Sequence, residues 1–220
     1  TYMNKINVIT IDGPSASGKG SLAMAIAQSF NFSLLDSGSL YRLLAYLVNK
    51  GESIDSASEI INKNVKFVIK DNNLLVLNDD IDISEKIRTE KIAGFASELS
   101  ARIEVRRALF EIQRSFYNEN GLVADGRDMG TVVFKDAKLK IFLTASPQKR
   151  AKRRYLELQK RGQEVNMPDL IADIEQRDLK DSSRELSPLL PADDAHVIDS
   201  SEMSLEEVVS YTKILVKEEY

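Results

Sequence analysis

The sequence predicts an α/β fold in which a parallel sheet of five strands is flanked by helices on both faces. Five short apolar runs, at 6–11, 33–35, 122–124, 139–144 and 196–198, are separated by segments with helical periodicity. Strands that alternate with helices connect by crossovers, and crossovers give parallel strands buried on both faces. The 220 residues are enough for one α/β domain with a sizeable core.

The first strand leads into a loop of small residues and then into a helix. The stretch 6–21 reads INVITIDGPSASGKGS, a variant of the phosphate-binding pattern G-x-x-x-x-G-K-[ST]. Small residues let successive backbone N–H groups surround an anion, and the following helix directs its positive end to the same point. We therefore expect a nucleoside triphosphate to bind at Gly13, Pro14, Ser15, Ala16, Ser17, Gly18, Lys19, Gly20 and Ser21.

One position departs from that pattern. Gly20 stands where the pattern has Ser or Thr, and the hydroxyl comes one residue later, at Ser21. In such loops this hydroxyl contacts the metal ion. No direct protein ligand of a metal is therefore assigned, and Ser21 stays open as one.

The remaining elements follow from periodicity and from start and stop signals. Helices are expected from 40 to 50, over 55–63, over 148–161 and from 168 to about 181, with a last helix opened by the capping box at 204–207. The segment 65–83 alternates around Asp71-Asn72-Asn73 and predicts a β-hairpin, which interrupts the strand–helix rhythm as an insertion. Between 89 and 120 two helices are expected, with a break near 100–102, and 183–195 is expected to be a loop.

Bulk composition excludes several classes of protein. The chain has no cysteine, so it has neither disulfides nor thiolate metal sites, and it has no apolar run of membrane-spanning length. The net charge of −4 argues against a surface devoted to nucleic acid. The basic run 149–161 is an alternative nucleic-acid patch, but Tyr155 is its only aromatic residue. We expect a cytoplasmic protein that binds neither nucleic acid nor membrane.

Polar residues follow several of the predicted strands. In parallel sheets, ligands bind beyond the carboxyl ends of the strands. The phosphate loop, Asp36-Ser37-Gly38, the cluster 125–128 and the loop after Thr144 should therefore meet at one edge of the sheet.

These segments together resemble the bacterial cytidylate kinases, a family of nucleoside monophosphate kinases. The resemblance is carried by IDGPSASGKGS (11–21), LLDSGSLYR (34–42), ADGRDMGTVVF (124–134), KIFLTAS (140–146) and RDLKDSSRELSPL (177–189). It implies a single P-loop NTPase domain over 1–220, with a monophosphate-binding region at about 37–119 that includes the hairpin, and a helical lid at about 149–184. It also implies a monomer that transfers the γ-phosphoryl group of ATP, with Mg²⁺, to CMP or dCMP.

The resemblance also implies roles for individual residues. It gives Ser37 and Arg42 to the acceptor phosphate, with Tyr41 beside them, and it gives Asp128 to the exocyclic amine of cytosine, with Ser97 and Arg106 as the other base contacts. Arg127 contacts the phosphates and Asp125 lies beside it. Arg177 and Asp181 reach the ribose hydroxyls and phosphate, and Arg184 closes over the transferring group. The catalytic set implied is Lys19, Arg42, Arg127, Arg177 and Arg184.

The side chains alone leave simpler interpretations open. Ser37 is also a typical N-cap serine, and the cluster 125–128 is also consistent with a structural salt-bridge network. Arg177, Asp181 and Arg184 are spaced by four and three residues, which predicts one helical face and fits a solvent-exposed salt-bridge stripe. His196 begins a predicted buried strand and is interpreted as structural.

The candidate site has no obvious general base. A kinase that phosphorylates a hydroxyl group uses a side chain that accepts its proton. A nucleoside monophosphate is already largely dianionic near pH 7, because its second pKa is about 6. An arginine-rich site without a base therefore fits a phosphate acceptor. The alternatives are a P-loop switch protein and a kinase of the same fold that acts on UMP, AMP or a small hydroxyl compound.

Overall fold

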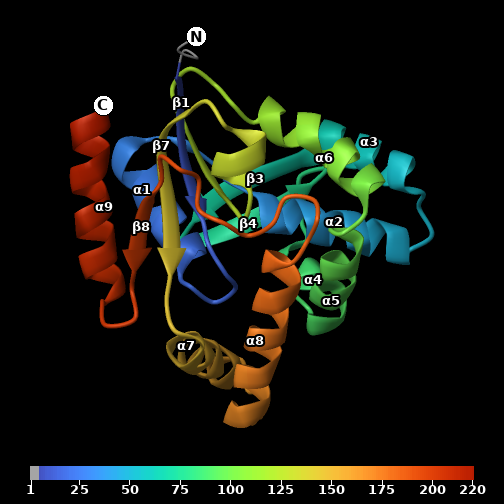
Figure 1. Ribbon diagram of the computed structural model, residues 1–220. Helices are drawn as coiled ribbons and strands as arrows, with labels where there is room; N and C mark the ends of the chain where they lie inside the picture. Colours follow the sequence, from blue (N-terminus) through green and yellow to red (C-terminus); the bar gives the residue numbers. More distant parts are fainter. Residues whose placement is uncertain (1–4) are drawn as a thin grey trace.

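The computed structural model describes residues 5–220, and its central feature is a five-stranded parallel sheet (Figure 1). The strand order is β2-β6-β1-β7-β8. The strands are β1 (Ile6–Asp12), β2 (Ser33–Asp36), β6 (Leu122–Gly126), β7 (Ala137–Thr144) and β8 (His196–Asp199). Their carboxyl ends point toward the paired helices α7 (Pro147–Lys160) and α8 (Met167–Ser182). The fold class predicted from the sequence is confirmed.

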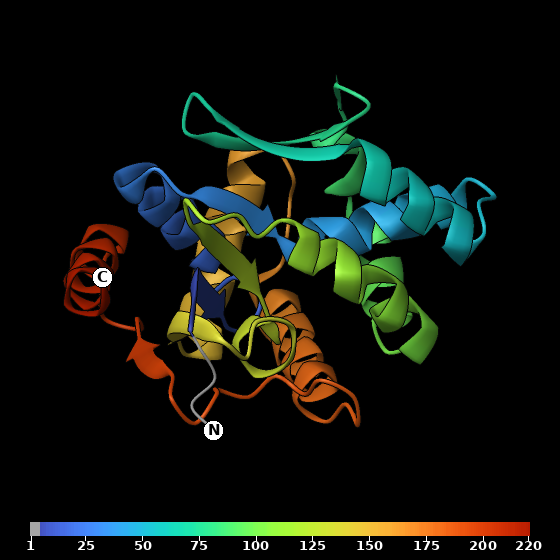
Figure 2. The same ribbon diagram turned by 90° about the horizontal axis from the view of Figure 1, so that it is seen from above.

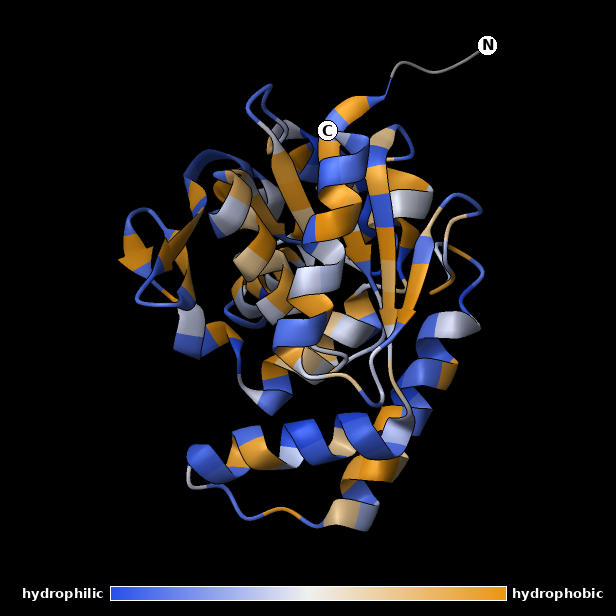
Figure 3. Cartoon of the chain, turned by 90° about the vertical axis from the view of Figure 1, so that its left-hand side faces the viewer, coloured by the Kyte–Doolittle hydropathy of each residue, from blue (hydrophilic) through white to orange (hydrophobic). Residues whose placement is uncertain are grey.

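The two faces of the sheet carry separate hydrophobic cores. Alternate residues of β1 face opposite sides, so Ile9 and Ile11 contribute to one core while Val8 contributes to the other. The first core packs against α1 (Lys19–Phe30) and α9 (Leu205–Glu219), and the second against α2 (Ser37–Asn49) and α6 (Ile103–Ser115). Figure 3 shows the strands of the sheet as mainly hydrophobic, with helices of mixed hydropathy packed around them.

Side-chain caps fix where most helices begin. Each capping oxygen accepts a hydrogen bond from a backbone N–H in the first helical turn, and this satisfies a donor that the helix leaves free. The capping residues are Asp36 for α2, Ser53 for α3 (Ile54–Asn64), Thr89 for α5 (Glu90–Leu99), Ser146 for α7, Asn166 for α8 and Ser204 for α9. The predicted capping box at Ser204 and Glu207 is present.

An insertion between α2 and β6 adds a second, antiparallel sheet. It contains β3 (Val65–Lys70), β4 (Asn73–Asn78) and the short β5 (Ile81–Asp82), followed by α4 (Ser84–Ile87), α5 and α6. Asp71 and Asn72 both have positive φ, as a two-residue hairpin turn requires. The predicted hairpin is therefore confirmed, and Figure 2 shows it extending past β2 toward α1.

The helices α7 and α8 form a separate pair beyond the carboxyl edge of the sheet (Figure 1). Arg150 on α7 is buried and forms a bidentate ion pair with Asp178 on α8, with 3.0 Å between Nη1 and Oδ1. This pair fixes the two helices against each other. The segment 183–195 returns from α8 to β8 without regular structure, as predicted.

Four details differ from the sequence predictions. Helix α2 begins at Ser37 and not at residue 40, because the Asp36 carboxylate accepts the Ser39 N–H and starts the helix earlier. A short π-helix, η1 (Met129–Val133), follows β6 where no helix was predicted. Helix α8 ends at Ser182, so Arg184 lies beyond the helix, and the single helical face predicted for it was wrong. The buried strand predicted at His196 was also wrong, because β8 is an edge strand and His196 is exposed.

Candidate active site

The phosphate loop between β1 and α1 is held in shape by close backbone packing. A Cβ at Gly13 would lie 2.1 Å from the Leu143 carbonyl oxygen, so a larger residue here would force the backbone to shift. Gly18 adopts the left-handed conformation (φ 91°) at the start of α1. Lys19 folds back and donates from Nζ to the Pro14 carbonyl oxygen at 3.3 Å. The loop thus encloses the space in front of the positive end of α1.

Two carboxylates lie next to the phosphate loop. Asp125, at the end of β6, is buried, and its Oδ2 would lie 3.4 Å from a Cβ at Gly20. Burial raises the pKa of Asp125 to about 7. The pKa of Lys19 is lowered to about 8, mainly by burial and secondly by the nearby Arg127 guanidinium. Asp36, at the end of β2, accepts hydrogen bonds from the N–H and hydroxyl of Ser39.

A cavity of about 530 Å³ opens in front of this loop and its carboxylates. It lies between the phosphate loop, the helix pair α7–α8 and the tip of the β3–β4 hairpin. Its lining combines five carboxylates with five arginines, and these charged residues are Asp36, Arg42, Arg88, Glu90, Asp125, Arg154, Glu157, Arg161, Asp173 and Arg177. The cavity is a strongly polar space next to the phosphate loop.

A smaller cavity lies deeper, between α2, α5 and the end of β6. It is lined by the polar residues Ser37, Tyr41, Ser97, Arg106, Arg127, Asp128, Asp181 and Arg184, among others. The Arg106 guanidinium donates to Asp128 Oδ2 at 2.8 Å and to the Ser100 carbonyl oxygen at 2.7 Å. Both side chains of this ion pair are largely buried. A carboxylate and a guanidinium are therefore fixed side by side on the wall of the cavity.

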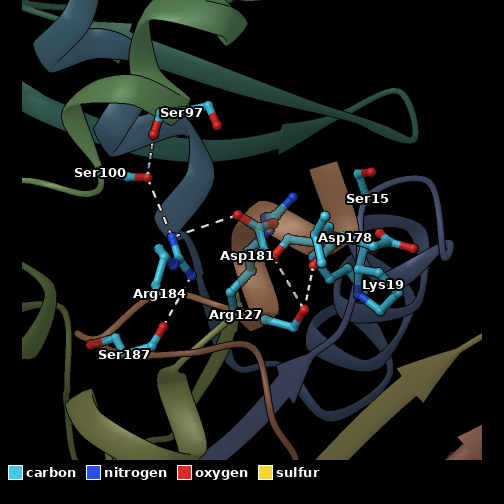
Figure 4. Close-up of polar contacts among 12 residues, drawn as sticks. Ser15, Lys19, Ser97, Ser100, Arg127, Asp178, Asp181, Arg184 and Ser187 are labelled. Carbon is cyan, nitrogen blue, oxygen red and sulfur yellow. Dashed lines mark hydrogen bonds and ion pairs between the residues drawn. The ribbon is translucent and has the colours of Figure 1, made fainter. Parts of the chain in front are cut away.

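A second ion-pair network closes the other wall of the smaller cavity (Figure 4). Asp181 on α8 accepts from Arg127 Nε at 2.5 Å and lies 3.6 Å from Arg184 Nη1. Arg184 also donates to the Ser100 hydroxyl and to the Ser187 carbonyl oxygen. These contacts join α8 to the loop after β6 and to the end of α5. The arginines of this wall are thus bound to protein oxygens.

Two arginines line both cavities. Arg42 comes from α2 and Arg177 from α8, and each contributes to the larger and to the smaller cavity. Burial lowers the pKa of both guanidinium groups, and that of Arg177 falls to about 10, with the neighbouring Arg127 as the second cause. The Arg177 Nε is buried and has no hydrogen-bond partner among the described residues. These positive charges mark the junction of the two cavities.

A third cavity, of about 420 Å³, lies between the phosphate loop, α7 and the start of α9. Its wall includes the apolar side chains Leu143, Met203, Leu205 and Val208. Arg153 crosses it and donates to the carbonyl oxygens of Ser17 and Ser200. The sequence does not predict this cavity, although Arg153 belongs to the basic segment 149–161. The side chain of Arg153 points inward to the loop, and periodicity does not reveal this.

Most of the residues predicted from the sequence line one of the three cavities. Ser15, Ala16, Gly20, Ser21, Arg42, Asp125 and Arg177 line the larger one, and the remaining predicted substrate residues line the smaller one. Ser17 and Gly18 line the third cavity, while Gly13, Pro14 and Lys19 line none of the three. Ser37 directly follows Asp36, the capping residue of α2, and its hydroxyl donates to Gln113 Oε1 at 2.7 Å. The sequence does not predict Gln113 as a residue of the site. Burial raises the pKa of Tyr41 to about 12, and its ring lies 5.7 Å from the Arg106 guanidinium carbon. Arg127, Asp128, Asp181 and Arg184 meet here from two distant segments.

Among residues 5–220, no group of three or more His, Cys, Asp or Glu side chains is arranged to hold a metal ion. No helix in this part of the chain is long and apolar enough to cross a membrane.

The fold and the paired cavities define a P-loop kinase with a second, basic and partly carboxylate-lined cavity next to its phosphate loop. Comparison with known proteins makes the assignment specific. The cytidylate kinase family matches residues 9–218, and the chain belongs to this family.

Curated relatives cover nearly the whole chain. A protein of Acinetobacter baylyi named cytidylate kinase is 46% identical over 92% of this chain and 93% of its own length. One of Yersinia pestis with the same name is 48% identical over 92% of this chain and 90% of its own. Among solved structures, a shikimate kinase from Bacteroides thetaiotaomicron aligns over 96% of this chain and 98% of its own, at 17% identity and a TM-score of 0.45.

Proposed function

We infer that the chain is a cytidylate kinase, which transfers the γ-phosphoryl group of ATP to CMP or dCMP and gives ADP and CDP or dCDP. Membership of the cytidylate kinase family supports this activity. The observation that carries the site assignment is the pair Arg42 and Arg177, which line both the phosphate-loop cavity and the deeper cavity. An acceptor phosphate and a donor phosphate that meet between these cavities would both contact positive charge.

In this proposal the phosphates of ATP bind the backbone of residues 13–21 and the Lys19 ammonium group. The nucleoside part occupies the third cavity, whose apolar side chains suit the faces of a base and a ribose. The Arg153 guanidinium lies at the edge of that cavity, where a planar cation can stack on a base.

CMP binds in the deeper cavity with its base against the Arg106–Asp128 pair. The exocyclic amine of cytosine is a donor, so it pairs with the Asp128 carboxylate. Ring N3 and the carbonyl O2 are acceptors, so they pair with Arg106 and Ser97. Uracil has a carbonyl in place of the amine, and its oxygen would face the same carboxylate with no proton between them. This difference accounts for base selection.

Charge neutralisation and alignment perform the transfer. The acceptor phosphate and the ATP phosphates repel each other, and the cations Lys19, Arg42, Arg127, Arg177 and Arg184 offset this repulsion. Arg127 and Arg184 form ion pairs with Asp181. We propose that phosphate oxygens compete for these guanidinium groups when CMP binds, and that Asp181 is then free to accept from ribose hydroxyls. The dianionic acceptor attacks the γ-phosphorus directly, so no protein base is needed.

The oxygen atoms near the phosphate loop fit a hydrated Mg²⁺ ion that accompanies ATP. The Asp125 Oδ1 is buried without a hydrogen-bond partner among residues 5–220, and the Ser21 hydroxyl and Asp36 line the same cavity. Mg²⁺ binds such oxygens while it keeps several of its waters. When bound, it would neutralise part of the phosphate charge.

We further propose one domain over 1–220, in which 37–119 binds the monophosphate and 149–184 closes as a lid. The same proposal includes a cytoplasmic monomer that binds nucleotides and does not bind nucleic acid.

A panel of acceptors tests the reaction. ADP release is measured with ATP and Mg²⁺ in the presence of CMP, dCMP, UMP or AMP at equal concentration, and CMP and dCMP are expected to support the fastest turnover. Turnover that does not depend on CMP would favour a nucleotide switch, and a preference for AMP or UMP would change the acceptor.

The site assignment has its own test. Asp128→Ala is expected to lower the CMP-to-UMP ratio of kcat/KM by about tenfold to a hundredfold, because a hydrogen bond to a charged group contributes about 1.5–3 kcal/mol. Its KM for ATP should stay nearly unchanged. Asp55→Ala, an exposed carboxylate on α3, serves as the control. An unchanged ratio in Asp128→Ala would remove Asp128 from the base site.

A further inference from the structure

Asp12 is a buried carboxylate that has no role in the proposed phosphoryl transfer. It is the last residue of β1, the central strand, and only 4% of it is exposed. Its Oδ1 accepts the Met129 N–H at 2.9 Å and its Oδ2 accepts the Gly130 N–H at 2.8 Å. Both donors belong to the first turn of η1, 117 and 118 residues further along the chain.

These two N–H groups are the donors that a helix leaves free at its start. An aspartate at the N-cap position normally accepts one of them with its own side chain. The N-cap residue of η1 is Asp128, and its side chain makes no capping hydrogen bond. Its backbone carbonyl accepts the N–H groups of Val132 and Val133, so the main chain of Asp128 is in the capping position while the carboxylate points elsewhere.

The Asp128 carboxylate instead forms the ion pair with Arg106 at the wall of the deeper cavity. Asp128 Oδ2 accepts from Arg106 Nη1 at 2.8 Å, and neither oxygen of this carboxylate caps η1. Because Asp12 satisfies the Met129 and Gly130 N–H groups, Asp128 is released from the role that its position would otherwise give it.

We propose that Asp12 is a positioning residue for pyrimidine recognition: it caps η1 from the neighbouring strand and thereby keeps the Asp128 carboxylate directed at the base. Asp12 acts through Asp128 and touches no substrate itself. The inference rests on the proposed function, in which Asp128 reads the exocyclic amine. Asp12 also connects the strand that carries the phosphate loop with the loop that selects the base.

The burial of Asp12 agrees with this role. Burial removes water from the Asp12 carboxylate and raises its pKa to about 7, and the hydrogen bonds from Met129 and Gly130 N–H offset part of this loss. Because burying a carboxylate is unfavourable, we expect one at this place to have a positioning role.

The test replaces Asp12 by asparagine, which has nearly the same shape but only one acceptor oxygen. In Asp12→Asn, one N–H of η1 loses its acceptor, and the Asp128 carboxylate is expected to turn back and cap it. The CMP-to-UMP ratio of kcat/KM should fall about tenfold, mainly through a higher KM for CMP, while the KM for ATP stays the same. The matched control is Thr10→Val, two residues earlier on the same strand, which removes a buried hydroxyl that has no hydrogen-bond partner among the described residues. Thr10→Val should keep the wild-type ratio.

A second variant approaches the same contact from the other side. In Gly130→Ala the added Cβ would lie 2.9 Å from Thr10 Oγ1 and 3.4 Å from Asp12 Oδ2, so the Gly130 N–H must shift relative to its acceptor. This variant should lower the same ratio, and it decides the case if Asp12→Asn fails to fold.

The results separate the two proposals. If Asp128→Ala lowers the ratio and folded Asp12→Asn or Gly130→Ala does not, the positioning role is overturned and the proposed function stands. If Asp128→Ala itself leaves the ratio unchanged, the base assignment fails and the role of Asp12 fails with it. An equal loss for CMP, UMP and ATP in Asp12→Asn would indicate a structural role alone.

Discussion

The protonation state of Lys19 makes nucleotide binding depend on pH in a defined direction. Burial and the neighbouring Arg127 guanidinium lower the pKa of Lys19 to about 8 in the free protein. The phosphates of a bound nucleotide place several negative charges beside the ammonium group and raise its pKa again. Binding above pH 8 must therefore take up a proton, and binding at lower pH need not.

The size of the effect follows from the free-state pKa. With a value of about 8, Lys19 is about 90% protonated at pH 7 and about 10% protonated at pH 9. Binding of ADP should accordingly take up about 0.1 proton through Lys19 at pH 7 and about 0.9 at pH 9. The dissociation constant should rise about tenfold per pH unit above pH 8. Burial raises the pKa of Asp125 to about 7, so this carboxylate adds uptake closer to neutral pH.

Isothermal titration calorimetry measures this uptake directly. ADP is titrated without metal at pH 7 and at pH 9, each in two buffers that differ in ionisation enthalpy, and the difference in heat gives the number of protons. Lys19→Arg keeps the positive charge but holds its proton throughout this range, so its uptake at pH 9 should fall close to zero. Asp125→Asn should keep the uptake at pH 9 and lose the part near pH 7. Equal uptake at pH 9 in Lys19→Arg and the wild type would refute the assignment to Lys19.

Three other predictions concern the lid and the loop. Arg184→Ala should lower kcat by at least about tenfold with little change in either nucleotide's affinity, and hydrogen exchange of 149–184 should slow when a bisubstrate analogue binds. Glu90→Gln removes the partner that Arg154 contacts across the mouth of the larger cavity, so exchange of the lid should become faster in the free protein. Gly13→Ala should destabilise the fold by about 1–3 kcal/mol in urea titrations, because the new methyl group meets a backbone carbonyl 2.1 Å away.

Each of these has a matched comparison. Lys180→Ala removes an exposed cation near the end of α8, four residues before Arg184, and should leave kcat unchanged. Glu157→Gln removes another carboxylate partner of Arg154, within α7, and should not alter the exchange of the lid as Glu90→Gln does. Gly94→Ala, in α5 with no atom within 4 Å of the added group, should be neutral or slightly stabilising. Equal effects in a variant and its comparison would contradict the corresponding prediction.

Local patterns in the sequence were sufficient for most of the architecture. Short apolar runs, helical spacing and the loop at 13–21 predict the five strands, the phosphate loop and the first helix, and all are present. The hairpin is also predicted from a local pattern, the turn at Asp71 and Asn72. Aspartate and asparagine tolerate the positive φ that this turn requires. The resemblance of several segments to one family then supplied the candidate site residues.

The tertiary structure alone decided which charges meet. Asp12 and Gly130 are 118 residues apart, Arg127 and Asp181 are 54 apart, and Ser37 and Gln113 are 76 apart, yet each pair is hydrogen-bonded. Periodicity reports only which face of an element is apolar, so it could not show that Asp128 leaves the capping of η1 to another carboxylate.

Burial and strand order decided the remaining differences. His196 has the sequence of a buried strand and lies exposed, because β8 is at the edge of the sheet. Lys19 and Asp125 acquire shifted pKa values only because the fold removes both from water and places them together. The sequence by itself therefore determined the elements and their chemistry, while the pairing of strands and the desolvation of charges, which depend on contacts between distant segments, determined the site.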